Sequence, residues 1–90
     1  MSSPAHKIRF GVLQVTIWRN TGENGPWYSA VPSRSYKKGD DAWAESDSLN
    51  AEDMPIMSEL LDQAFSWIVK QKQADSTARR AREQANTSAD

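Results

Sequence analysis

The sequence predicts an α+β fold in which a four-stranded antiparallel sheet is followed by one long C-terminal helix. Two patterns lead to this prediction. Apolar and polar residues alternate through much of residues 6–49, which is typical of strands that bury one face. From Met54 onward the apolar residues recur at spacings of three and four, which is typical of an amphipathic helix.

Two strands on either side of Gly11, or one sharply bent strand, are predicted at the start of the chain. Apolar and basic side chains alternate in residues 6–10, and a second alternation begins at Leu13 and includes Ile17. The parity of the apolar positions changes between Phe10 and Leu13. Because a slip of one residue would turn the core face toward solvent, we expect a bulge or a tight turn near Gly11.

Two further strands are predicted between stretches that favour loops. Residues 20–26 are rich in glycine and asparagine and are predicted as a loop. The third strand follows at residues 27–37, where Pro32 indicates an edge position or a bulge. A charged turn at residues 37–41 then leads to a shorter and more polar fourth strand at residues 43–49.

The predicted helix spans about five turns. Asn50 is expected to cap it, with Asp53 completing a capping-box arrangement, and Pro55 is compatible only with the first turn. We expect its apolar stripe to pack on the sheet. The stripe consists of Met54, Met57, Leu61, Ala64 and Ile68, and it is widened by Leu60 and Phe65.

A single β4-α domain is predicted at residues 6–71, after a flexible N-terminus at residues 1–5. Alanines are the only apolar residues of the segment 72–90. We expect this segment to be a polar, disordered tail or a frayed continuation of the helix. The arginines of residues 79–82 are interpreted as solvated, with contact to phosphates as the alternative.

The composition limits what this small domain can be. The 90 residues include no cysteine, which excludes disulfides, thiolate nucleophiles and cysteine-ligated metals. A domain of this size is marginally stable unless it is assembled, so we expect a homodimer. Trp67 lies off the main helical stripe and indicates a helix–helix contact. The predicted dimer interface consists of Met57, Leu61, Ala64, Trp67 and Ile68.

No arrangement of side chains indicates an enzyme, and no cofactor, metal or small-molecule substrate is expected. His6 is the only histidine, and its position near a chain end is unsuited to a general base, which needs rigid positioning. A run of acidic residues lacks the spacing of a calcium-binding loop. We interpret this run as a solvated turn and a charged edge strand; it consists of Asp40, Asp41, Glu45 and Asp47.

Neither a membrane span nor a secretion signal is predicted. No apolar run approaches the roughly 18 residues that a span requires, and the first residues lack a signal-peptide pattern. We therefore expect a cytoplasmic protein without membrane contact. The net charge of −1 gives no general indication of nucleic acid, although residues 51–69 hold four acidic and no basic side chains between mildly basic ends.

Aromatic and basic residues on the strands are the main functional indication. Four tryptophans in 90 residues are more than a core this small accommodates. Single-stranded nucleic acid binds where bases stack on aromatic rings while cations follow the phosphates. The candidate stacking residues are Trp18, Tyr28 and Tyr36. The candidate backbone contacts are Lys7, Arg9, Arg19, Arg34, Lys37 and Lys38.

We expect such side chains on the sheet face away from the helix. Two sets are predicted there: Gln14, Thr16 and Trp18, and Tyr28, Arg34, Tyr36 and Lys38. This face is expected to bind single-stranded DNA or RNA without reading its sequence. The alternative is a protein-interaction or structural module, in which the rings dock a protein partner. The lack of a basic excess favours the alternative, because phosphate contacts dominate nucleic-acid affinity.

Two stretches resemble the positive-cofactor-four type of transcriptional coactivator. Ser48-Leu49-Asn50-Ala51-Glu52 is similar to the Ser-Leu-Asn-Pro-Glu step between the last strand and the helix of that family. Val15-Thr16-Ile17-Trp18-Arg19 is similar to its central strand. The resemblance implies a dimer with packed helices and outward-facing curved sheets. It also implies single-stranded DNA binding in transcription, replication or recombination.

The chain resembles more closely a group of small, mostly uncharacterised bacterial and phage proteins. The similar motifs are Arg9-Phe10-Gly11, residues 16–20, Trp27-Tyr28-Ser29, residues 34–37 and residues 62–68. Together the two resemblances cover residues 7–70. Both imply a non-catalytic protein that binds single-stranded DNA.

Overall fold

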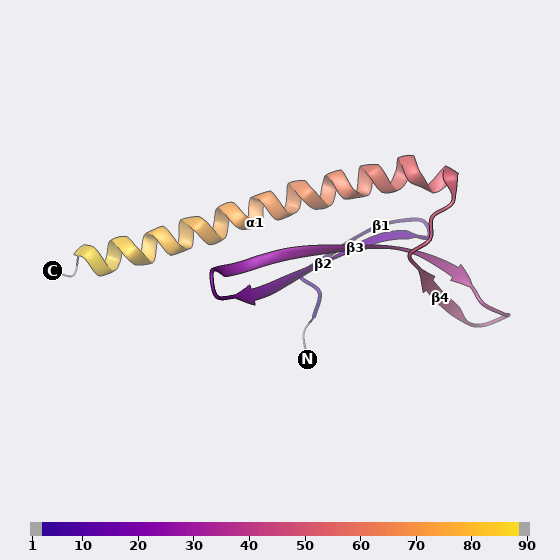
Figure 1. Ribbon diagram of the computed structural model, residues 1–90, viewed down its shortest axis with the longest axis horizontal. Helices are drawn as coiled ribbons and strands as arrows, with labels where there is room; N and C mark the ends of the chain where they lie inside the picture. The colour runs from indigo at the N-terminus through magenta and orange to yellow at the C-terminus, as the bar shows by residue number, and fades with distance from the viewer. Residues whose placement is uncertain (1–2, 89–90) are drawn as a thin grey trace.

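A computed structural model describes residues 3–88 of the chain and the side chains of residues 3–85. Four strands form one antiparallel sheet in the order β1-β2-β3-β4, and the helix α1 follows them (Figure 1). The strands are His6–Phe10 (β1), Leu13–Gly22 (β2), Gly25–Lys37 (β3) and Trp43–Ser46 (β4). A short 3₁₀ turn, Ala51–Asp53, leads into α1, Met54–Ser88. The predicted fold class is confirmed.

A two-residue turn explains the change of parity between the first two strands. Phe10 pairs directly with Leu13, and only Gly11 and Val12 lie between them. Gly11 has a φ of 60°. A glycine with positive φ at the first central position is typical of a type II′ turn, whose twist matches that of the flanking strands. The tight turn predicted near Gly11 is confirmed.

The β2–β3 hairpin is longer than predicted, because most of the expected loop belongs to its strands. Gly22 pairs with Gly25, which leaves only Glu23 and Asn24 in the turn. Gly25 closes this turn with a φ of 108°, a backbone conformation that favours glycine. β1 and β4 do not pair with residues 18–29 of this hairpin. These residues therefore form a two-stranded extension, which we call the arm.

Pro32 lies in β3 where that strand has a neighbour on one side only. It pairs with Val15 of β2, whereas β4 pairs with residues 34–37. Proline has no N–H to donate, so it is tolerated at a position where the strand has no second hydrogen-bonded neighbour. The predicted edge position of Pro32 is confirmed.

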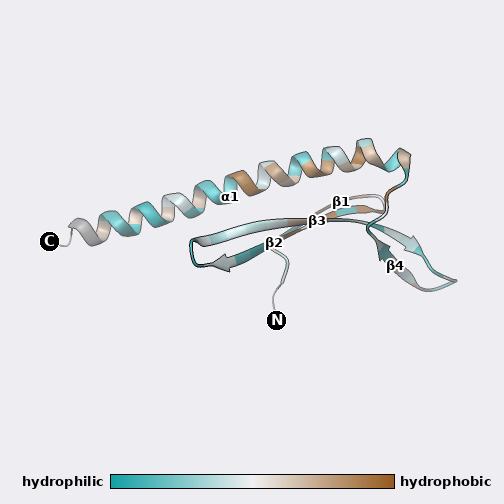
Figure 2. Ribbon diagram, in the orientation of Figure 1, coloured by the Kyte–Doolittle hydropathy of each residue, from teal (hydrophilic) through white to brown (hydrophobic). Residues whose placement is uncertain are grey.

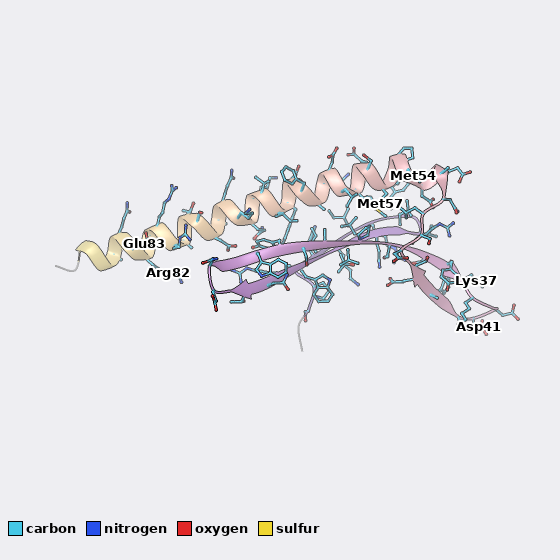
Figure 3. The ribbon with its side chains drawn as sticks, in the orientation of Figure 1. Lys37, Asp41, Met54, Met57, Arg82 and Glu83 are labelled. Atoms are coloured by element: carbon cyan, nitrogen blue, oxygen red, sulfur yellow. The ribbon has the colours of Figure 1, made fainter. Side chains whose placement is uncertain are left out.

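The core lies between α1 and the sheet face beneath it. Its fully buried side chains come from β2 and α1; they are Leu13, Val15, Ile17, Met57, Leu60 and Ala64, all at most 4% exposed. Apolar residues concentrate in the half of α1 that covers the sheet, and the far half is hydrophilic (Figure 2). Met57 points from α1 toward the sheet (Figure 3).

The buried stripe of α1 contains only part of the predicted one: Met57, Leu60 and Ala64 are buried, whereas Met54 is 58% exposed. Leu60 is 4% exposed, whereas Leu61 is 39% and Phe65 is 67% exposed. The expected core positions of Leu61 and Phe65 are therefore wrong. Both stripes have spacings of three and four, so helical periodicity alone does not distinguish them. Contact with β2 selects the stripe that includes Leu60.

α1 continues to Ser88, through most of the segment where disorder or a frayed helix was expected. The segment is helical, since its alanines and arginines favour helix and extend one that is already nucleated. The 35 residues of α1 span about 52 Å, and its end projects beyond the arm (Figure 1). Of the chain ends expected to be flexible, residues 1–2 and 89–90 lie outside the described residues.

Membrane spanning was not expected. No helical segment of the described residues combines the length and apolarity that a bilayer span requires.

The adjacent leucines of α1 provide a matched test of the core. Leu60→Ala should lower the free energy of unfolding by about 3 kcal/mol, because it leaves a cavity in the core. Leu61→Ala should lower it by less than about 1 kcal/mol, because Leu61 is 39% exposed. Urea denaturation followed by circular dichroism measures both. Equal losses, or a larger loss at Leu61, would place the core on the other stripe.

Candidate nucleic-acid interface

The pairing register determines which face of the sheet each side chain occupies. Arg34 lies opposite Leu13, a residue of the core under α1. Directly paired residues project from the same face, and alternate residues of one strand do so too. Tyr28 and Tyr36 therefore lie on the helix side together with Arg34. The prediction that these three residues face away from the helix is wrong, because the turn at residues 23–24 sets the opposite parity.

Asp75 of α1 binds two side chains of the arm. The hydroxyl of Tyr28 donates a hydrogen bond to Asp75 Oδ2 at 2.7 Å. Arg19 Nη2 lies 3.4 Å from Asp75 Oδ1, and Arg19 Nε donates to the Tyr28 hydroxyl at 3.2 Å. We call these three residues the arm triad. They join both strands of the arm to the helix, so Arg19 and Tyr28 have a structural task on the helix side.

The arm triad shifts the pKa of two of its members. Burial raises the pKa of Tyr28 above its ordinary value of 10.0, and the hydrogen bond to Asp75 acts in the same direction. The hydrogen bond with Tyr28 raises the pKa of Arg19 above its ordinary value, and the charge of Asp75 adds to this effect. Both groups therefore keep their protons at physiological pH, and the triad stays intact.

Arg34 attaches the sheet to the start of the helix. Its Nε lies 2.9 Å from Asp53 Oδ2, and the Asp53 side chain is 14% exposed. The same carboxylate oxygen accepts a hydrogen bond from the backbone N–H of Asn50 at 2.9 Å. The predicted capping-box arrangement of Asn50 and Asp53 is confirmed. Asp53 thus fixes the direction in which α1 leaves the sheet.

Trp67 is partly buried on the helix side of the sheet, where it contacts two rings of the strands. It stacks on His6 with ring centroids 4.8 Å apart and presents an edge-to-face contact to Tyr28 at 6.1 Å. Of the predicted dimer-interface residues, Met57 and Ala64 are buried in the core, and Trp67 and Ile68 pack against it. Leu61 is the exposed member.

Three tryptophans lie on the sheet face away from α1, which we call the outer face. Trp18 of β2 is half-buried, whereas Trp27 of β3 is 54% and Trp43 of β4 is 64% exposed. Each has the strand parity opposite to that of the core residues. Gln14 and Thr16 share this parity, which confirms the predicted outward direction of this set on β2.

Three basic side chains share the outer face with the tryptophans. Lys7 and Arg9 of β1 lie opposite outer-face positions of β2, and Lys37 lies opposite Trp43. Lys37 stands at the β3–β4 turn (Figure 3), and Lys38 belongs to that turn. Of the predicted site, the outer face therefore contains Lys7, Arg9, Trp18 and Lys37, and it also contains Trp27 and Trp43.

A row of polar side chains forms the floor of the outer face. Gln14, Thr16, Ser33 and Ser35 are only 8% to 9% exposed, although α1 lies on the other side of the sheet. The amide of Gln14 donates a hydrogen bond to Glu45 of β4 and so reaches across β3. The exposed parts of the outer face are therefore its tryptophans and cations.

Trp27 and Trp43 are not among the predicted site residues, because the predicted outer face took the parity of Tyr28 and Tyr36. The sequence contains a signal that places them. If the hairpin is closed between Gly22 and Gly25, then Trp27 takes the parity of Trp18 and turns outward. A polar-Asn-Gly pattern between two strand-like runs favours a tight hairpin turn at this place, and Gly25 tolerates the positive φ that closes it.

Comparisons of the chain with protein-family models, with curated proteins and with solved structures find no match. The resemblances to coactivators and to phage proteins therefore stay predictions. Among the described residues, no group of three or more histidine, cysteine, aspartate or glutamate side chains is placed to hold a metal ion. The geometry of the outer face is the basis for a functional proposal.

The arm triad makes stability depend on pH in the alkaline range. Tyr28→Phe should lower the free energy of unfolding by about 1 kcal/mol at neutral pH, because a partly exposed hydrogen bond to a carboxylate is lost. The pKa of Tyr28 is raised in the folded state. Its contribution is therefore complete below the unfolded pKa and is lost as the pH rises through the folded pKa.

Urea denaturation between neutral pH and pH 11 measures this effect. The difference between wild type and Tyr28→Phe should narrow above pH 10. Tyr36→Phe is the matched control, since Tyr36 is 40% exposed, and it should change stability by less than about 0.5 kcal/mol. A difference for Tyr28→Phe that stays constant across the range would mean that ionisation of the hydroxyl is not linked to stability.

Proposed function

We propose that the protein binds single-stranded nucleic acid, DNA or RNA, on the outer face of its sheet. The observation that carries the proposal is that three tryptophans and three cations share this face while α1 covers the other. Exposed tryptophan rings leave apolar area in water, and several of them on one face of the sheet indicate a contact surface. Each base stacked on an aromatic ring contributes about 1–3 kcal/mol, and every base has a face to stack.

The positions of the tryptophans suit an extended ligand. Trp27 lies in the arm, and Trp43 lies beside Lys37 at the opposite end of β3. Ten residues separate Trp27 from Lys37 along β3, which corresponds to at most about 33 Å of strand. A single strand of several nucleotides reaches from one ring to the other, with Trp18 between them.

The cations set the expected strength and salt dependence of binding. Lys7, Arg9 and Lys37 lie on the outer face, and Glu45 is the one acidic residue that the four strands place there. With three phosphate contacts, the slope of log affinity against log salt should be about −2. The small number of cations and the net charge of −1 favour moderate affinity without sequence readout.

A protein partner is the second candidate for this face. Val31 is 49% exposed, and its strand parity places it on the outer face between Trp27 and Ser33. An apolar residue among the rings suits a protein surface as well as a base. In this case the rings would anchor the partner and the charges would lie at the rim.

Titration with a mixed-sequence oligonucleotide tests the nucleic-acid proposal. Tryptophan fluorescence should be quenched, less so at high salt, and single strands should bind more tightly than duplex. Trp27→Ala and Trp43→Ala should each weaken the binding of a labelled oligonucleotide by about 5- to 150-fold, the loss of one stacked base. No quenching at low salt with micromolar protein would reject nucleic acid and leave the protein partner.

The matched control for these variants is Tyr36→Ala. Tyr36 is also aromatic and 40% exposed, but it lies on the helix side of the sheet. Its substitution should leave oligonucleotide affinity unchanged. An equal loss in Tyr36→Ala would place the ligand on the other face.

We also propose that the protein acts as a homodimer, as its small size predicts. Met54, Leu61 and Phe65 fall on one stripe of α1 and are 58%, 39% and 67% exposed. A second copy of the helix would cover this stripe. Sedimentation equilibrium at micromolar concentration should give a dimer for wild type and a shift toward monomer for Leu61→Asp. A monomer at every concentration would contradict the proposal.

A further inference from the structure

A basic groove lies on the helix side of the molecule, where α1 passes the tip of the arm. It has a volume of about 480 Å³. One wall is the tip of the hairpin at residues 24–26, and the other is α1. Its charged lining residues are Arg19, Lys72, Asp75, Arg79 and Arg82. The outer face does not include this groove.

The charges of the basic groove are unbalanced. Four cations and one carboxylate line it, and the carboxylate of Asp75 is already engaged by Tyr28 at 2.7 Å and by Arg19 at 3.4 Å. Among the side chains of residues 3–85, Lys72, Arg79 and Arg82 form no ion pair. Among the residues that line the groove, the cations therefore exceed the acidic side chains by three.

The helix concentrates these cations on one stripe. Lys72, Asp75, Arg79 and Arg82 are separated by three, four and three residues, so they project from α1 in one direction. Like charges at such spacings repel one another and destabilise a helix slightly. Arg80 projects elsewhere and does not line the groove. An anion held between the arginines would relieve the repulsion.

We propose that the basic groove binds a phosphate group, supplied by the backbone of the nucleic acid that the outer face holds. This inference rests on the proposed function. Arg79 and Arg82 lie nearly one helical turn apart, and the planar fork of each guanidinium fits two phosphate oxygens. Lys72 adds a point charge. A phosphate is the anion whose tetrahedral oxygens engage several such donors at once.

The hairpin tip connects the basic groove to the outer face. Pro26 lines the groove, and the next residue, Trp27, has its ring against Gly22 at the end of the arm. A strand that stacks a base on Trp27 therefore leaves the sheet beside the groove. Its following phosphate passes around the tip and reaches Arg79 and Arg82. The groove thus sets where the bound strand turns from the sheet toward α1.

The double variant Arg79→Gln, Arg82→Gln tests the inference. It should weaken the binding of a single-stranded oligonucleotide roughly tenfold and reduce the salt slope by about 1.4, for two lost phosphate contacts. The matched control is Lys70→Gln, Arg80→Gln, which removes the same charge from α1 outside the basic groove. The control should keep the affinity of wild type within about twofold.

Inorganic phosphate provides a second arm of the experiment. At equal ionic strength, phosphate should compete with the oligonucleotide more strongly than chloride does in wild type, and this excess should vanish in Arg79→Gln, Arg82→Gln. If the double variant and its control lose oligonucleotide affinity equally, the loss reflects the overall charge of α1 and not the basic groove. This result would overturn the inference. Unchanged binding in both would overturn it as well while the outer-face proposal stands. Failure of wild type to bind any oligonucleotide would overturn both.

Discussion

The register of the β2–β3 hairpin decides which side chains lie on the outer face of the sheet. The turn of Glu23 and Asn24 pairs Gly22 with Gly25, and every other pair of the two strands follows from it. A turn with one residue more or less would bring Tyr28 to the outer face and turn the ring of Trp27 under the helix. The position of Trp27 on the outer face depends on this two-residue turn, and the proposed function depends on that position.

The side chains that this register turns inward attach the helix at two places. Arg34 meets Asp53 where α1 begins, and Tyr28 meets Asp75 beside the arm. Between the two places, the buried leucine, methionine and alanine side chains of α1 cover β2. Polar contacts therefore set the direction of the helix. Apolar burial supplies most of the free energy that holds α1 on the sheet. This arrangement leaves the outer face of the sheet uncovered.

Features that depend on local patterns could be predicted from the sequence, whereas features that depend on pairing could not. The order of elements, the turn at Gly11 and the cap at Asn50 follow from neighbouring residues. The side on which Tyr28 lies does not, because both parities of β3 carry aromatic residues and only pairing with β2 separates them. The same holds for Leu60 and Leu61, since each fits a helical period and the sheet selects one. About half of the candidate site was therefore assigned to the wrong face.

A two-stranded ribbon has little stability of its own in water, yet the arm carries Trp27 and one wall of the basic groove. The contact that supports it comes from Asp75, 47 residues after Tyr28 in the chain. α1 thus supports the arm through the carboxylate of Asp75, in addition to the contact between Trp67 and Tyr28. A chain that ended before Asp75 would keep its core and the contact between Trp67 and Tyr28, but the arm that carries Trp27 would lose its polar attachment to α1. In such a protein the proposed ligand would be held less firmly at Trp27 than at Trp43.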